Sequence, residues 1–562
     1  MQSASRPSRY AWIALSNTTL AIFMSAVDGS IVIISLPAIF RGIHLDPLAP
    51  ENIGYLLWMI MGYLLVQAVL VVTLGRLGDM YGRVRMYNAG FVVFTFGSVL
   101  LSFDPFRGAA GADWLIGWRM LQALGGSMLT ANSAAILTDA FPADRRGFAL
   151  GINQVAALAG MFIGLVLGGV LAEIDWRAIF WINVPVGLWG TVWAYLKLRD
   201  SGVRRRERID WWGNLTFAVG LSALLIGITD GIHPYKDHPM GWTSPVTLVL
   251  LIGGTALLAV FAVVERSVSE PMFRLDLFRI RAFTAGNVAL LASSIARGGI
   301  QFMLVIWLQG IWLPLHGYDY ADTPLWGGIY LLPLTFGFLI AGPISGTLSD
   351  RFGARTFATA GALVSAAGFV GLLLLPIDFP YWAFALLTAI NGVGMGMFAA
   401  PNTAAIMSSV PADERGVASG MRATFMNAGR LLSIGIFFSL MIVGLAGSLP
   451  TTFALGLQNE GVPATIARQV ASLPPVSSLF AALLGVNPVE QLLAPTGTLR
   501  TLSPAQAHAL TGKTFFPHLI AAPFHQGLLV AFSFAAALSL FAALASLLRG
   551  GRYMAPVIAE ID

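Results

Sequence analysis

The sequence reads GRLGDMYGRVR at residues 75–85 and repeats the same pattern as GTLSDRFGAR at residues 346–355. Both stretches fit G-x-L-x-D-x-x-G, and an arginine follows the last glycine by three positions in the first stretch and by two in the second. A second pair, FPADRRG at 141–147 and VPADERG at 410–416, is offset by 269 residues, close to the 271 of the first pair. Equal offsets indicate an internal repeat. The chain is therefore predicted to consist of two similar halves related in parallel, an arrangement found in transporters that bind their substrate at the midplane.

The composition predicts a membrane protein. Of 562 residues, 56% are hydrophobic and only 11% are charged, and the mean hydropathy is +0.75. A soluble protein carries about 25% charged residues. The absence of cysteine excludes disulfides, thiolate metal sites and thiol catalysis. The net charge of +5 resides in short segments between apolar runs, with no basic stripe beside aromatic residues, so nucleic acid is not an expected partner.

Fourteen apolar segments are long enough to cross a membrane, which takes about 20 helical residues. We expect an all-α integral membrane protein with two parallel, pseudo-symmetric six-helix bundles and two extra linker helices. The predicted spans are 13–37, 53–73, 87–103, 114–138, 147–171, 178–197, 211–229, 244–264, 283–307, 325–345, 356–376, 381–405, 417–446 and 525–549.

The spans suggest three domains. Residues 1–200 form an N-terminal six-helix bundle, 201–275 the two linker helices, and 276–562 a C-terminal six-helix bundle with an external loop at 447–524. This Pro- and Leu-rich loop is interpreted as an external cap or a re-entrant piece, with a role in substrate exit as the alternative. An even number of spans puts both termini on one side. Placing them in the cytoplasm puts most Lys and Arg in inside segments, as the positive-inside rule requires.

Three further segments make a resemblance specific. VDGSIVIISLP at 27–37 resembles a first-helix signature, and Trp176-Arg177 with NVPVG at 183–187 matches a pattern at the start of the sixth helix. Together with the repeated loop motif, they make the chain similar to the major facilitator superfamily, and within it to the fourteen-helix drug:proton antiporters of the EmrB/QacA kind. The resemblance covers nearly the whole chain except 447–524. It implies a proton-coupled exporter of hydrophobic or amphipathic compounds such as drugs, working by alternating access in the cell membrane.

Asp28 is the first candidate for chemistry. It is the only Asp or Glu well inside a predicted span, and an ionisable residue at that depth is costly enough to indicate function. Proton coupling or binding of a substrate cation is predicted, with a structural carboxylate as the alternative. Arg119, within GWRMLQALG at 117–125, resembles the family's fourth-helix arginine implicated in proton transfer. Its alternative role is snorkelling to the outer interface. Gln122, one turn on, is placed to satisfy Arg119.

Two more arginines lie deep within spans. Arg297 is central in the ninth span and Arg430 is deep in the thirteenth, and neither has an obvious carboxylate in its own helix. Each is expected to pair with Asp28 or with backbone carbonyls, in a cavity or in helix packing. Methionine and aromatic side chains suit adaptable binding of apolar ligands. The other residues proposed to line a cavity are Trp58, Met59, Phe302, Met303, Trp307 and Asn391.

The repeated loop motif is interpreted as a conformational gate. Asp79 with Arg83 and Arg85 forms a predicted charge clamp, and the glycines permit a tight turn. The alternative is that its arginines only retain the topology. The gate residues, including those of the second copy, are Gly75, Asp79, Gly82, Arg83, Arg85, Asp350 and Arg351.

Gly160, Gly164 and Gly168 recur every four residues in the fifth span, and Gly169 follows. This spacing puts three glycines on one helix face, where another backbone can approach closely. The segment resembles the fifth-helix antiporter motif G-x-x-x-G-P-x-x-G-G. Leu165 replaces its proline, which keeps the packing face but removes the kink.

Other functions were weighed on the same residues. A lipid exporter or flippase of the same fold and a non-transporting membrane sensor remain alternatives. The sequence contains no nucleotide-binding loop, metal-ligand cluster or nucleophile–base set, so neither an enzyme nor ATP-driven transport is expected. No cofactor or metal is predicted. The expected partners are a small amphipathic substrate, protons and membrane lipids, and we expect the chain to act as a monomer.

Overall fold

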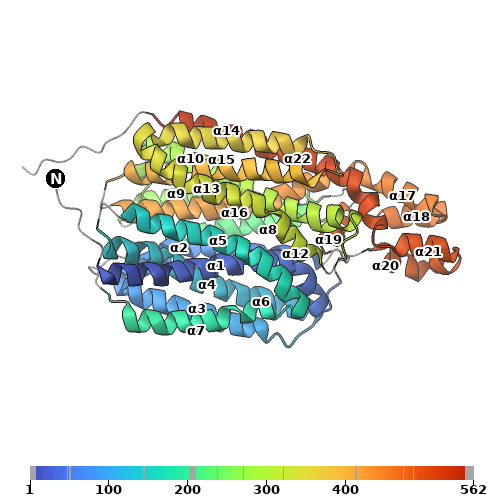
Figure 1. Ribbon diagram of the computed structural model, residues 1–562, viewed down its shortest axis with the longest axis horizontal. Coiled ribbons are helices and arrows are strands. Elements are labelled where there is room, and N and C mark those ends of the chain that lie inside the picture. The colour runs from blue at the N-terminus through green and yellow to red at the C-terminus, as the bar shows by residue number, and fades with distance from the viewer. Residues whose placement is uncertain are drawn as a thin grey trace, which may run out of the picture.

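The computed structural model is built from α-helices that run nearly parallel to one long axis (Figure 1). It describes residues 8–550 except 47–48, 50–51, 143–145, 201–209, 237, 239, 270, 272, 321, 412–413, 473 and 485–486. Within these residues the only β-type pairing is an isolated bridge between Tyr235 and His238. The predicted fold class, an all-α membrane protein, is confirmed.

The N-terminal half forms one helix bundle. Helix α1 packs against α5, α4 and α7, whereas α4 also packs against α2 and α3, and α3 against α7. Pro37 is accommodated inside α1. The helices are α1 (Arg9–Gly42), α2 (Ile53–Tyr81), α3 (Arg83–Ser102), α4 (Gly108–Ala140), α5 (Arg146–Ile174), α6 (Ala178–Trp181) and α7 (Asn183–Lys197).

The C-terminal half repeats this pattern of neighbours. Helix α10 packs against α16, α15 and α22, α15 packs against α13 and α14, and α14 against α22. The match between the halves confirms the parallel pseudo-symmetry predicted from the two loop motifs. The helices are α10 (Arg281–Ile306), the π-helix η3 (Trp307–Trp312), α11 (Leu313–Leu315), α12 (Thr323–Tyr330), α13 (Leu332–Phe352), α14 (Ala354–Leu373), α15 (Tyr381–Ser408), α16 (Arg415–Ala446) and α22 (Phe515–Leu547).

Two helices stand between the halves in sequence. Helices α8 (Trp211–Ile232) and α9 (Pro245–Ser267) pack on each other, and α8 also contacts α2 and α16. The 3₁₀ helix η2 (Leu275–Arg279) leads into the second half. Because α2 and α16 come from different bundles and pack together, α8 lies against the junction of the two halves.

The predicted spans all coincide with helices. Among the described residues, 13 helices are long and apolar enough to cross a membrane. The remaining predicted span, 114–138, lies in the 33-residue α4, whose polar residues lower its hydropathy. The last span was placed too late, because α22 begins at Phe515 rather than near residue 525. Pro523 and His525 interrupt the apolar run, but the helix continues through both.

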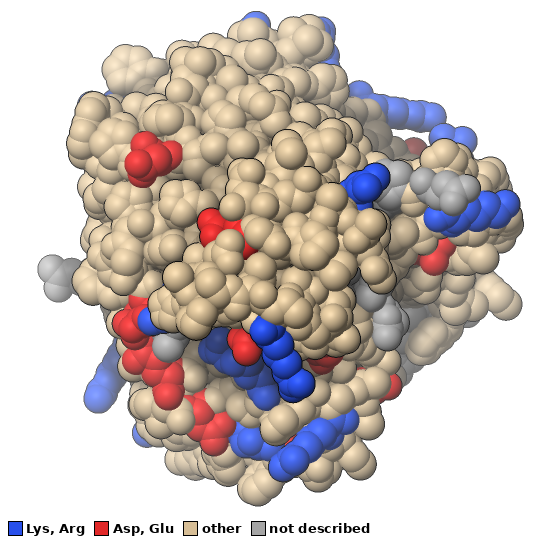
Figure 2. All heavy atoms as spheres, turned by 90° about the vertical axis from the view of Figure 1, so that its right-hand side faces the viewer, with Lys and Arg blue, Asp and Glu red and all other residues tan. Residues whose placement is uncertain are grey.

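The predicted external loop is mostly helical. Helices α17, α18, α20 and α21 project beyond one end of the bundles as a cap (Figure 1). Viewed from that end, uncharged side chains cover most of the surface, and charged ones lie mostly in the lower part of the view and along its right-hand margin (Figure 2). The segment contains α17 (Leu449–Asn459), α18 (Ala464–Ala471), α19 (Pro475–Leu484), α20 (Val489–Leu493), η5 (Ala494–Thr496), η6 (Thr498–Arg500) and α21 (Pro504–Thr511).

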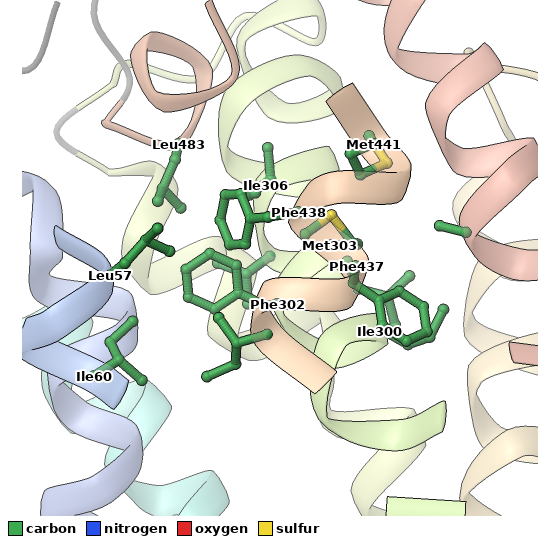
Figure 3. Packing of buried hydrophobic residues seen from close by; sticks show 14 of the residues in the cluster. Leu57, Ile60, Ile300, Phe302, Met303, Ile306, Phe437, Phe438, Met441 and Leu483 are labelled. Carbon is green, nitrogen blue, oxygen red and sulfur yellow. The ribbon is translucent and has the colours of Figure 1, made fainter. Parts of the chain in front are cut away.

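Helix α19 differs from the rest of the cap because all ten of its residues are buried. It contacts α1 and α2 of the first bundle and α10, η3 and α16 of the second. Figure 3 shows Leu483 of α19 beside Leu57 of α2 and near Phe302 and Phe438. The Phe438 ring lies 5.1 Å from Phe302 and stacks at 5.2 Å on Phe480 of α19. The cap thus inserts an apolar helix between the bundles.

Candidate functional site

The centre of the N-terminal bundle holds a buried ion pair. The Nη1 of Arg119 on α4 donates to Oδ2 of Asp28 on α1 at 2.6 Å. The side chains are 2% and 0% exposed. Gln122 donates from Nε2 to Asp28 Oδ1 at 2.9 Å, and Asn183 at the start of α7 donates to the same oxygen at 2.8 Å. Three helices therefore converge on one carboxylate.

Arg119 is held from several sides. Its Nη1 also donates to Gln122 Oε1 at 2.6 Å, and its guanidinium lies 4.2 Å from the centre of the Tyr63 ring on α2. Gln122 donates in turn to Ser98 Oγ on α3 at 2.8 Å. A cation over an aromatic face is stabilised by the ring quadrupole. The snorkelling alternative for Arg119 does not describe this geometry, because its guanidinium points into the bundle.

The donor set around Asp28 fits an ionised carboxylate. Every neighbour that bonds to Asp28 donates an N–H group. An ionised carboxylate can accept all of these bonds, whereas a protonated carboxyl group can accept fewer of them. Oδ1 accepts two of these bonds and Oδ2 accepts one, so a proton on Asp28 would remove the negative charge that holds Arg119 and would weaken the bonds from Gln122 and Asn183. Protonation of Asp28 and the attachment of α4 and α7 to α1 are therefore physically linked.

Sequence reasoning missed three members of this site. Tyr63, Ser98 and Asn183 are all ordinary polar residues within apolar helices. Asn183 had a signal, because it begins the NVPVG segment at 183–187 that matched the family pattern. Tyr63 and Ser98 had none, since their part in the site depends on how α2 and α3 pack around α4.

The C-terminal bundle lacks this ion pair at the equivalent place. Asn391 follows Gln122 by 269 residues, the offset of the second repeat. Gly368 packs against the Asn391 backbone as Gly97 packs against the Gln122 backbone. Both amide atoms of Asn391 are buried without a hydrogen-bond partner among the described residues. The two halves thus share a scaffold but differ in charge at its centre.

Arg297 and Arg430 do not pair with Asp28, whose hydrogen-bond partners among the described residues all belong to the first half. They lie instead on α10 and α16, two helices that pack together in the second half. Arg422 lies on α16 eight residues before Arg430 and donates to Thr403 Oγ1 of α15 at 3.4 Å. The structure therefore places these arginines in the second half, apart from the Asp28 site.

The apolar candidates separate into two groups. Phe302 and Met303 are in the cluster between the bundles (Figure 3), and Met59 of α2 is also buried in the main core. Trp58 is half-buried against that core. Trp307 packs against Phe379, Phe384 and Phe532, with ring centres 4.8–6.1 Å apart, so it belongs to the interior of the C-terminal half.

The loop motif forms a clamp different from the predicted one. Arg83 bonds Asp79 one turn earlier at 2.7 Å and reaches Asp139 at the end of α4 at 2.6 Å. Arg85 is exposed instead of joining them. Gly82 has φ +112°, which favours glycine, and links α2 to α3.

The other gate residues have less defined surroundings. Gly75 of α2 faces Ala131 of α4, where a Cβ would make ordinary contact. Arg351 is exposed near the end of α13. The side chain of Asp350 lies outside the described part of the structure. Ala354 follows the second-copy glycine, so that copy has no counterpart of Arg83.

The glycine face of α5 packs on α1. A Cβ at Gly160, Gly164 or Gly168 would lie 2.6, 2.6 and 2.8 Å from the carbonyl oxygens of Phe23, Val27 and Ile31, respectively. These approaches are closer than any side chain allows. Gly169 faces the other bundle, where its Cβ would lie 2.6 Å from Leu325 Cα on α12. One run of glycines therefore serves both packing within a bundle and packing between bundles.

Among the described residues, no group of three His, Asp or Glu side chains is arranged to hold a metal ion.

Comparison with known proteins places this geometry in a wider context. A sequence model of the Major Facilitator Superfamily matches residues 18–434. The riboflavin transporter RibZ of Clostridioides difficile is 30% identical over 433 residues, covering 76% of this chain and 88% of that protein. The multidrug resistance protein Stp of Mycobacterium tuberculosis is 30% identical and covers 82% and 80%. The tetracenomycin C resistance and export protein of Streptomyces glaucescens is 28% identical and covers 83% and 84%.

Solved structures agree on the fold. An inward-facing, unoccupied bacterial homologue of the human lysosomal transporter Spinster has a TM-score of 0.57 at 14% identity, covering 97% of this chain and all of that one. A crystal structure of a D-xylose–proton symporter has a TM-score of 0.54 at 14% identity, covering 77% and 90%. At this identity the likeness concerns the fold alone.

Proposed function

Because the chain belongs to the Major Facilitator Superfamily, and so is a multi-pass membrane transporter, we propose that it is a proton-coupled exporter of hydrophobic or amphipathic compounds. Relatives whose names record multidrug resistance or antibiotic export support the direction of transport and the substrate class. The two helices between the bundles support placement with the fourteen-helix EmrB/QacA-like antiporters. The positive-inside pattern supports cytoplasmic termini.

The observation that carries the proposal is the buried Asp28–Arg119 pair. A carboxylate at this depth, paired with a fixed cation, loses the attraction of that cation when it binds a proton. In the proposed cycle, a proton from the outside binds Asp28 Oδ2 and Arg119 loses that contact. Release of the proton to the inside restores the pair. The contacts that hold α4 and α7 to Asp28 of α1 therefore weaken and form again in each cycle. We propose that this change in helix packing drives the movement of the substrate.

Alternating access needs contacts that close each end in turn. At the capped end, α19 lies between the bundles and Gly169 of α5 packs on Leu325 of α12. At the opposite end, Arg83 joins the ends of α2 and α4 through Asp79 and Asp139. We assign the α19 and Gly169 contacts to the outer gate. The Arg83 clamp lies within the N-terminal bundle, and we assign it to a latch that stabilises one conformation at the inner end. The bundles that move are 1–200 and 276–562, and 201–275 forms the linker.

The test is Asp28→Asn in cells lacking their own efflux pumps. Accumulation of a panel of amphipathic compounds of different charge, including riboflavin and tetracenomycin C, is measured with and without an uncoupler. Wild type should lower the accumulation of at least one compound, and the uncoupler should abolish that effect. Asp28→Asn should behave like uncoupled wild type while reaching the membrane at normal levels.

The matched control is Asp113→Asn, which removes an exposed carboxylate from α4, the helix that carries Arg119. It should export as wild type does. Uncoupler-sensitive export by Asp28→Asn would overturn the proton-coupling assignment.

A further inference from the structure

Three arginines of the C-terminal bundle take no part in the proton site. Arg297 lies on α10, and Arg422 and Arg430 lie on α16. The backbones of the two helices touch at this level, since a Cβ on Gly298 would lie 3.2 Å from the Arg430 carbonyl oxygen. The Ser433 hydroxyl also donates to the Ile295 carbonyl. Arg297 and Arg430 therefore occur at the same height on two adjoining helices.

No ion pair formed by the described residues includes any of these arginines. Asp28 is taken by Arg119, and Glu414 at the start of α16 pairs with Arg274. Arg422 makes one long contact, from Nη1 to Thr403 Oγ1 of α15 at 3.4 Å, and its Nε is buried without a partner in the described structure.

An apolar cluster between the bundles lies about one to two helical turns from Arg297 and Arg430. In Figure 3, Phe302 of α10 and Phe438 of α16 face Leu57 of α2. Phe302 follows Arg297 by five residues and Phe438 follows Arg430 by eight. The two arginines are therefore close, along their helices, to an apolar cluster that both bundles share.

Arg297 and Arg430 are two cations of like sign at one level, which are expensive to hold together in a membrane. Unpaired guanidinium groups lose hydration and repel one another, and arginines near the middle of a helix cannot reach the lipid headgroups easily. Their cost falls if an anion binds between them. Guanidinium groups suit carboxylate and phosphate because they donate parallel N–H bonds in a fixed plane.

We propose that Arg297 and Arg430 recognise the acidic group of an amphipathic substrate, a carboxylate or a phosphate, whose apolar part packs against Phe302 and Phe438. The proposal rests on the proposed transport function and narrows its substrate class to anionic amphiphiles. The N-terminal bundle then handles the proton and the C-terminal bundle handles the substrate charge.

The test measures binding, with no proton gradient, on the full-length protein in phosphatidylcholine nanodiscs. The probes are 1-pyrenebutyrate and its uncharged methyl ester, detected by energy transfer from tryptophan after subtraction of partitioning into empty nanodiscs. Wild type should bind the acid at least about tenfold more tightly than the ester, the scale of one charge-assisted hydrogen bond. Arg297→Gln and Arg430→Gln should lose this preference, and Arg430→Lys should retain most of it.

The control is Arg468→Gln, which removes the same charge from an exposed position on α18 of the cap and should leave both affinities unchanged. Equal binding of acid and ester by wild type would overturn the proposal, as would an unchanged preference in both Gln variants. Phosphatidylglycerol nanodiscs distinguish the source of the anion: loss of probe binding there assigns the site to lipid headgroups, and persistence assigns it to a separate substrate. A failed proton-coupling test would leave these binding results standing, because no gradient is used.

Discussion

The buried pair makes a quantitative prediction through a double-mutant cycle of Asp28→Asn and Arg119→Gln. Arg119 Nη1 and Asp28 Oδ2 are 2.6 Å apart, and the side chains are 2% and 0% exposed. Removing one partner of such a pair leaves the other charge buried, which costs about 3–5 kcal/mol. Each single substitution should therefore lower the free energy of unfolding of the N-terminal bundle by about that amount.

The double variant should lose much less. It replaces two charges with two neutral amides, and the asparagine retains an oxygen that can accept from Gln122 or Asn183. Without a stranded charge, we expect a cost of about 1–2 kcal/mol, the scale of one or two neutral hydrogen bonds. The coupling energy between the substitutions should then be at least about 4 kcal/mol.

The measurement is denaturant-induced unfolding in one detergent for the wild type and the three variants, followed by uncoupler-sensitive export in cells. Stability should recover in the double variant, whereas proton-coupled export should be absent from every variant that lacks Asp28. Additive losses of stability, within about 0.5 kcal/mol, would refute the reasoning that the two charges depend on each other.

Two further predictions concern packing and gating. Gly164→Leu should separate α5 from α1, because even a Cβ would lie 2.6 Å from the Val27 carbonyl oxygen. The yield of folded protein in an expression assay should fall several-fold. Gly151→Leu, at an exposed position with open space, should leave that yield unchanged. The chain has no native cysteine, so a single introduced cysteine can be labelled selectively. Leu483→Cys on buried α19 should react slowly with an impermeant maleimide, and faster when a proton gradient drives the cycle. Leu455→Cys on α17, at a position that is 60% exposed, should react rapidly in both conditions. Equal and rapid labelling of both would show that α19 does not close the space between the bundles.

Local sequence accounts for most of the architecture. Apolar runs of about 20 residues leave few choices for a backbone that must satisfy its own hydrogen bonds in lipid, so helix positions could be read directly. The error at α22 arose where Pro523 and His525 broke the run. The helices of the cap could not be read in the same way, because they are short and α19 is buried only through contacts with two bundles.

Sequence by itself determined that this chain is a helical membrane protein with two similar halves and that Asp28 and Arg119 are unusual for their depth. Those conclusions follow from the price of exposing polar groups to lipid, which depends on residue type and run length alone. Only the tertiary structure decided which charges meet. In the folded protein, Asp28 pairs with Arg119 and accepts a hydrogen bond from Asn183. Arg85 stays apart from the Arg83 clamp, and Arg297 and Arg430 lie at one level on adjoining helices. Pairing depends on which helix faces turn toward each other, and residues 91 or more positions apart in the chain become neighbours only after packing.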